Sequence, residues 1–150
     1  MLPHKHLIYG TIFFGIIYFL FPSLGELNIF IAWISSWLII DLDHYLRFLI
    51  KTKSLNPLKF WKWSMQQKNK WKEIKDKKDY KLPIFIFHGI EFLGLIFIFS
   101  FIWPILIWVF YGFCFHLVFD FYHLVKKSIP VYSKTSPVYT WQKNKNKKEL

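Results

Sequence analysis

Two long apolar stretches, residues 7–50 and 82–125, dominate the pattern of hydrophobic and polar positions along the chain. Each is 44 residues long, and runs such as 7–21 and 29–40 are nearly uninterrupted, without the polar face of an amphipathic helix. One helical crossing of a bilayer core takes about 20 residues. Each stretch therefore predicts a helical hairpin that crosses a membrane twice.

The two hairpin turns are predicted where this apolar pattern breaks. The first contains Pro22 and Gly25, and the second lies between Ser100 and Pro104, because proline cannot continue the interior of a helix. The prediction is an all-α integral membrane protein with four transmembrane helices, at about residues 7–22, 28–47, 82–100 and 105–125. These spans form one domain, residues 1–130, and residues 131–150 are predicted to be a basic, flexible tail.

Charge along the chain predicts its orientation. Of the 20 Lys and Arg residues, twelve lie between Arg47 and Lys81 and seven lie from Lys126 onward, and the formal net charge is +11. Cytoplasmic loops of membrane proteins carry such an excess of basic residues. We therefore expect a multi-pass protein of the plasma or inner membrane, with both termini and the basic loop 51–81 in the cytoplasm.

The basic loop also carries aromatic residues. Trp61, Trp63 and Trp71 stand among its lysines, a mixture typical of the headgroup layer. This pattern predicts an interfacial helix and makes anionic lipid headgroups the expected partners of the loop and tail, so that nucleic acid is not needed to explain the charge. The alternative is a docking site for a soluble partner or an anionic substrate.

The first apolar segment has a second interpretation. Lys5 precedes an apolar run, and residues 23–25 loosely resemble the small-residue cleavage site of a secretory signal. Cleavage there would leave the other spans in place but remove His6.

Charged and imidazole side chains occur inside the predicted spans, although a charged residue costs on the order of 3 kcal/mol at the centre of a membrane helix. Every one of them falls in the cytoplasmic half of its span, although the helix direction alternates. The set consists of His6, Asp41, Asp43, His44, His88, Glu91, His116, Asp120 and His123. We therefore expect these groups to lie at one depth, facing the interior of the bundle.

Helical spacing supports this grouping. His116, Asp120 and His123 stand at i, i+4 and i+7, and both Asp41–His44 and His88–Glu91 are i, i+3 pairs, so each set shares a helix face. Mixed imidazole and carboxylate ligands suit a divalent transition metal such as zinc, manganese or iron. The alternatives are hydrogen bonds that hold the helices together and a proton relay.

Two motifs carry a resemblance to a known family. Residues 40–44 read Ile-Asp-Leu-Asp-His and residues 116–120 read His-Leu-Val-Phe-Asp. With an early His and a His in the third span, they resemble the predicted membrane-bound metal-dependent hydrolases, the YdjM-like proteins of bacteria and archaea. The resemblance covers most of residues 6–120. It implies a metal site with the ligands His6, Asp41, Asp43, His44, His88, His116 and Asp120.

The leading functional hypothesis is a metal-dependent hydrolase of an ester or phosphoester, lipid-linked or not, at the cytoplasmic membrane face. A bound dication acidifies water, and Glu91, the carboxylate outside the matching ligands, is the expected general base. A metal or ion transporter is the second hypothesis. The outer halves of the spans carry almost no charge, however, and a transporter of this length would need to be a homo-oligomer. The third is a structural membrane protein whose polar cluster packs helices together.

Overall fold

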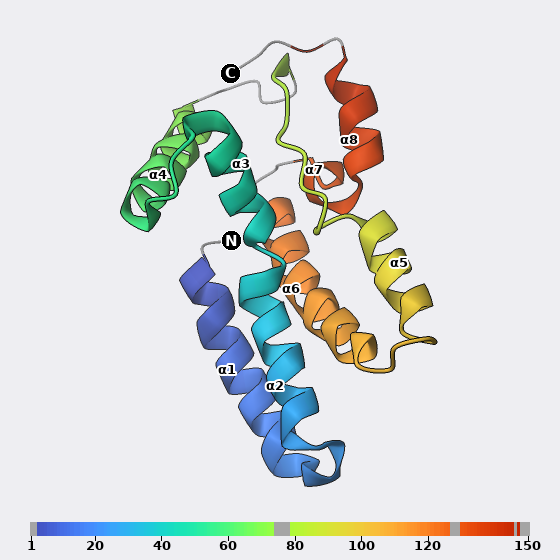
Figure 1. Ribbon diagram of the computed structural model, residues 1–150. Helices are drawn as coiled ribbons and strands as arrows, with labels where there is room; N and C mark the ends of the chain where they lie inside the picture. The colour runs from blue at the N-terminus through green and yellow to red at the C-terminus, as the bar shows by residue number, and fades with distance from the viewer. Residues whose placement is uncertain (1–2, 74–78, 127–129, 146, 148–150) are drawn as a thin grey trace.

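The computed structural model describes residues 3–73, 79–126, 130–145 and 147, and this part of the chain is all-helical, as the sequence predicts. The helices are labelled in Figure 1. Their bounds are α1 Pro3–Leu20, α2 Glu26–Ile34, α3 Leu42–Thr52, α4 Pro57–Glu73, α5 Ile90–Phe99, α6 Leu106–Lys126, α7 Tyr132–Thr135 and α8 Pro137–Asn144.

Four helices make the body of the molecule. α1 and α2 form an antiparallel hairpin closed by the 3₁₀ turn Pro22–Leu24 and by Gly25, whose φ of 82° suits a residue without a side chain. α6 packs against α2, and α5 packs against α6 (Figure 1). The first hairpin turn therefore lies where the sequence predicts it.

Among the described residues, two helical segments are long and apolar enough to cross a membrane. They are Glu26–Thr52, with 27 residues, and Leu106–Lys126, with 21. The apolar part of α1, Lys5–Leu20, and all of α5 are shorter. Large apolar side chains such as Ile12, Phe19 and Ile98 are exposed on these helices, and such extensive apolar surface marks a contact with lipid or with another protein.

The predicted helix over residues 82–100 is wrong in its first half, since residues 81–89 are non-helical and α5 begins only at Ile90. Other groups satisfy the backbone of this segment. The Asn144 side chain binds both the N–H and the C=O of Leu82, at 2.9 and 2.8 Å, and the Phe87 N–H donates to Asp43 Oδ2 at 3.1 Å. Pro83, which has no N–H, fits such an extended segment.

The predicted span 28–47 is helical but interrupted. A π-helical turn, Ser35–Ile39, follows α2, and Asp41 then stands directly before α3, where its backbone carbonyl accepts from the His44 N–H at 3.1 Å. Single π-turns inside helices are frequent at functional sites. The interruption falls directly before the Asp-Leu-Asp-His motif.

The segment 132–144 differs from the predicted flexible tail, because it forms α7 and α8. Ser136 caps α8 by accepting a hydrogen bond from the Tyr139 N–H at 3.1 Å. Thr140, fully buried, donates to the Tyr132 carbonyl at 2.7 Å. The basic composition misled the prediction, since a few buried polar side chains dock this segment.

Truncating Asn144 is expected to release α8. Asn144→Ala removes both hydrogen bonds to Leu82, and leaving buried backbone groups unpaired costs about 1–3 kcal/mol each. Amide hydrogen exchange in residues 137–144 should therefore accelerate at least roughly tenfold. The exposed neighbour supplies the control, Gln142→Ala, and equal exchange in the two variants would contradict the docking role of Asn144.

A close approach of helices at Gly112 supports the fold. A Cβ added there would lie 2.3 Å from the Ala32 carbonyl oxygen and 2.8 Å from Ser35 Cβ. Gly112→Ala is therefore expected to push α6 away from α2 and to lower stability by about 1–3 kcal/mol. Gly94→Ala, with open space around the new methyl, is the control. Equal thermal unfolding midpoints for the two variants in detergent would contradict the close contact of α6 with α2 at Gly112.

Candidate metal centre

The seven predicted ligands come together at one end of the helical body. His6 is in the first turns of α1, Asp41–His44 lie at the junction of α2 and α3, His88 lies in the loop before α5, and His116 and Asp120 are on α6. Figure 1 shows the start of α1, this junction and the last turns of α6 at the same level. His6, His88, His116 and Asp120 are at most 1% exposed. The structure thus brings these seven residues together from separate segments of the chain.

Four of the side chains form the centre of the cluster. Asp120 Oδ2 lies 3.5 Å from His88 Nε2 and 3.3 Å from His116 Nε2. Asp41 Oδ1 lies 3.7 and 3.8 Å from the same two nitrogens. Most of these distances exceed a normal hydrogen bond. Ligand atoms on a tetrahedrally bound metal lie about 3.3 Å apart when each is about 2.0–2.1 Å from the ion. The two Asp120 distances are close to this value, and the two Asp41 distances are somewhat longer.

Hydrogen bonds on the far side of the rings orient these two histidines. His116 Nδ1 lies 2.8 Å from the carbonyl oxygen of Ser36, in the π-helical turn. Because a carbonyl only accepts, Nδ1 carries a proton, and Nε2 is the nitrogen that faces Asp120 and that would bind a metal. His88 Nδ1 contacts Asp43 Oδ2 at 3.0 Å, the arrangement in which a carboxylate holds a metal-binding histidine. Asp43 thus fits a supporting role better than direct ligation.

His6 and His44 flank the centre on either side. The His6 ring stacks on His116, with centroids 3.8 Å apart, and its Nε2 lies 3.4 Å from Asp120 Oδ1. His44 Nε2 lies 3.5 Å from Asp41 Oδ1. Within the described residues, both nitrogens of His6 and the Nε2 of His88 are buried without a hydrogen-bond partner. Such orphaned groups are rare, and a metal ion would satisfy them.

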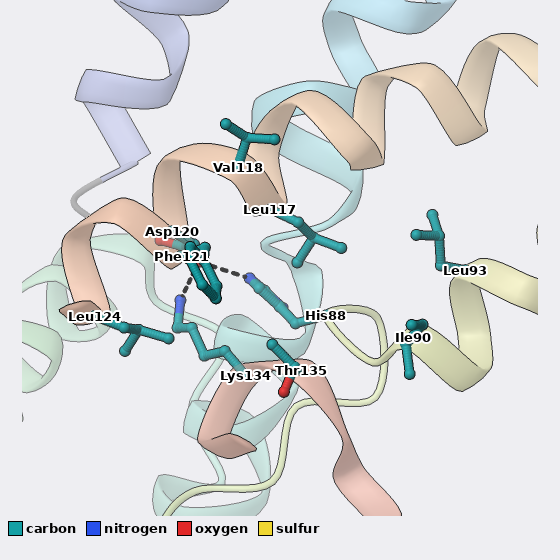
Figure 2. A pocket seen from close by; sticks show the side chains of 10 residues that line it. All are labelled: His88, Ile90, Leu93, Leu117, Val118, Asp120, Phe121, Leu124, Lys134 and Thr135. Atoms are coloured by element: carbon teal, nitrogen blue, oxygen red, sulfur yellow. Dashed lines mark hydrogen bonds and ion pairs between the residues drawn. The ribbon is translucent and has the colours of Figure 1, made fainter. Parts of the chain in front are cut away.

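Lys134, on α7, is a member of the cluster that the sequence did not indicate. Its Nζ lies 2.5 Å from Asp120 Oδ2 and 3.4 Å from His44 Nε2, and Figure 2 shows the lysine pointing at Asp120. Burial acts to lower the pKa of this lysine, but the carboxylates of Asp120 and Asp41 outweigh it and hold the pKa above its usual value. Lys134 therefore carries a full positive charge at neutral pH.

Glu91 occupies a different position from the one expected. Its Oε1 accepts a hydrogen bond from Ser136 Oγ, and it belongs to none of the three His/Asp groups found among the described residues. The predicted same-face pair with His88 is wrong, because His88 precedes α5 and is not on a helix. Its role as a general base stays a prediction.

The fold and this cluster define a class: a helical protein with buried His and Asp groups that could hold a metal ion. No protein-family model, curated protein or solved structure matches the chain. The similarity to the YdjM-like hydrolases therefore stays a prediction, and the geometry of the cluster carries the functional proposal.

Proposed function

We propose that this chain is a multi-pass membrane protein that binds a divalent transition metal and hydrolyses an ester or phosphoester at the cytoplasmic face. The membrane part of the proposal draws on the two helices of sufficient length and on the exposed apolar side chains of α1, α2, α5 and α6. In the proposed topology α1 and α5 also cross, α4 lies in the headgroup layer, and the basic segments and both termini are cytoplasmic.

The spacing of the four central ligand atoms is the observation that carries the metal proposal. The electrostatics agree with it. Metal ligation requires ionised carboxylates and neutral imidazoles, and in that state Asp41, Asp43 and Asp120 against Lys134 leave a formal charge of −2. A buried charge of this size is costly unless compensated, and one dication would neutralise it. Zinc, manganese and iron all accept such mixed nitrogen and oxygen ligands.

Hydrolysis is the reaction that this donor set suits. Two histidines and two carboxylates would hold the dication, which would supply a bound water of lowered pKa and polarise the substrate. In the reaction the water oxygen forms the new bond to phosphorus or carbonyl carbon, the ester oxygen leaves, and that oxygen takes up a proton. The residues' part is to hold the ion, and Asp43 and the Ser36 carbonyl keep the imidazoles in the ligating tautomer.

Metal content and hydrolysis, measured on the same preparation, test the proposal. The protein purified in detergent without chelator is expected to hold about one equivalent of a transition metal and to hydrolyse p-nitrophenyl phosphate or p-nitrophenyl acetate. Chelation should abolish turnover, and added zinc, manganese or iron should restore it. Asp41→Asn should lower turnover at least roughly 100-fold, whereas the exposed Asp79→Asn serves as control.

The alternative functions predict different outcomes. Metal binding with vesicle uptake of the ion, but without turnover, would favour a transporter. Absence of metal after attempted reconstitution would leave a helix-packing cluster and would overturn the hydrolase.

A further inference from the structure

A cavity of about 300 Å³ adjoins the metal centre, at the small end of the range for ligand sites. One end is polar and presents His88, Asp120 and Lys134. The remainder is apolar apart from Thr135, and Figure 2 shows the apolar side chains projecting from α5 and α6. The apolar lining consists of Ile90, Leu93, Leu117, Val118, Phe121 and Leu124.

The apolar end of the cavity reaches the outer surface of α6. Val118 is 66% exposed and Phe121 is 51% exposed, and across the cavity Ile90 is 65% exposed. α6 is one of the two helices long enough to cross a membrane. In the proposed topology this opening faces the bilayer, so a hydrocarbon chain can enter sideways without passing through water.

The charge at the polar end of the cavity favours an anionic group in any ligand bound there. The Lys134 ammonium lines the cavity beside Asp120, whose carboxylate is also a proposed metal ligand. A dication bound there would be coordinated by the same carboxylate, so the ammonium and the ion would lie close together. An anionic group between two cations is stabilised by both, and a phosphate oxygen accepts from lysine as a strong charge-assisted hydrogen bond.

We propose that the cavity binds an amphiphile with one alkyl chain along its apolar wall and a phosphate or phosphoester headgroup at Lys134 and the metal ligands. This substrate class depends on the proposed function, because the headgroup lies where the hydrolytic metal would be. The occupant is a membrane amphiphile rather than a free phosphate, since most of the lining would gain nothing from a small anion.

Binding, rather than turnover, is the test. The protein in nanodiscs is titrated with dodecyl phosphate that carries a photoreactive diazirine near the chain end. Unlabelled dodecyl phosphate, inorganic phosphate and dodecanol are the competitors, and the metal content is measured in parallel. Val118→Trp places an indole in the cavity wall at an exposed site. Val125→Trp makes the same change at an exposed site on α6 outside the cavity lining.

The expected result is labelling of α5 and α6 peptides that Val118→Trp weakens at least roughly tenfold and Val125→Trp leaves unchanged, with equal metal content in both variants. Lys134→Gln should weaken the competition by the phosphate amphiphile but not by dodecanol. The proposal is overturned if inorganic phosphate competes as well as the amphiphile, if both tryptophan variants label equally, or if cross-linking shows a second copy of the chain filling the cavity. Each of these outcomes leaves the metal result intact, whereas loss of metal alone counts against the hydrolase.

Discussion

Asp120→Asn is expected to lower the amount of bound metal at least roughly tenfold, the largest loss among single substitutions in the cluster. Asp120 is central because its two oxygens face three imidazoles: Oδ1 lies 3.4 Å from His6 Nε2, and Oδ2 lies within 3.5 Å of Nε2 of both His88 and His116. Asparagine keeps the shape of the side chain but supplies a neutral ligand. Elemental mass spectrometry on the purified protein measures the effect.

The control for this experiment separates loss of ligand from loss of fold. Asp79→Asn removes a carboxylate from an exposed position in the loop before α5 and should keep its full metal content. Circular dichroism and size-exclusion elution should agree for the two variants. Full metal occupancy in a folded Asp120→Asn protein would refute the proposed centre.

Lys134→Met is expected to destabilise the metal-free protein strongly and the metal-loaded protein much less. The Lys134 side chain is 13% exposed and that of Asp120 is 2% exposed, and removing one partner of a buried ion pair costs about 3–5 kcal/mol because the other charge is left unpaired. For a chain of this size that corresponds to a fall of about 10 °C in the thermal midpoint. A dication bound to Asp120 supplies the missing positive charge, so saturating zinc or manganese should restore most of the loss.

Thermal scans at one heating rate, with and without metal, measure the difference. Lys143→Met is the matched control, because Lys143 lies over the Tyr139 ring and its ammonium contacts no member of the cluster in the described structure. An equal loss in Lys134→Met with and without metal would mean that Lys134 supports the fold independently of the centre. No loss in either state would mean that the ion pair with Asp120 contributes nothing.

The sequence predicted the helical class and singled out the histidines and aspartates of the cluster, because both depend on strong local signals. Polar groups in an apolar span are conspicuous, and their common depth follows from counting residues along the helices. The structure places His6 and His88 beside Asp120, although the helix along which the sequence argument counted to His88 begins only at Ile90.

Long-range pairing set the limits of that prediction. Residues 82–89 are apolar enough to resemble a helix, but Asn144 and Asp43 bind their backbone groups from distant positions. Lys134 resembles the other tail lysines in the sequence, and only the docking of α7 brings it to Asp120. Whether an aspartate binds the metal or orients a histidine depends on which ring nitrogen it contacts, and residue spacing does not encode this detail. Asp43 contacts His88 Nδ1.

The Lys134–Asp120 ion pair links the C-terminal segment thermodynamically to the proposed metal centre. α7 and α8 are anchored by Ser136 on Glu91 and by Asn144 on Leu82, so the lysine is delivered by a unit with its own docking equilibrium. Two ligands that share one carboxylate are linked, and linkage is reciprocal. If metal binding changes the docking equilibrium of this segment by some factor, docking changes the affinity for metal by the same factor. A protein or lipid contact at the C-terminal segment that shifts its docking would therefore also change how tightly the proposed centre binds its ion.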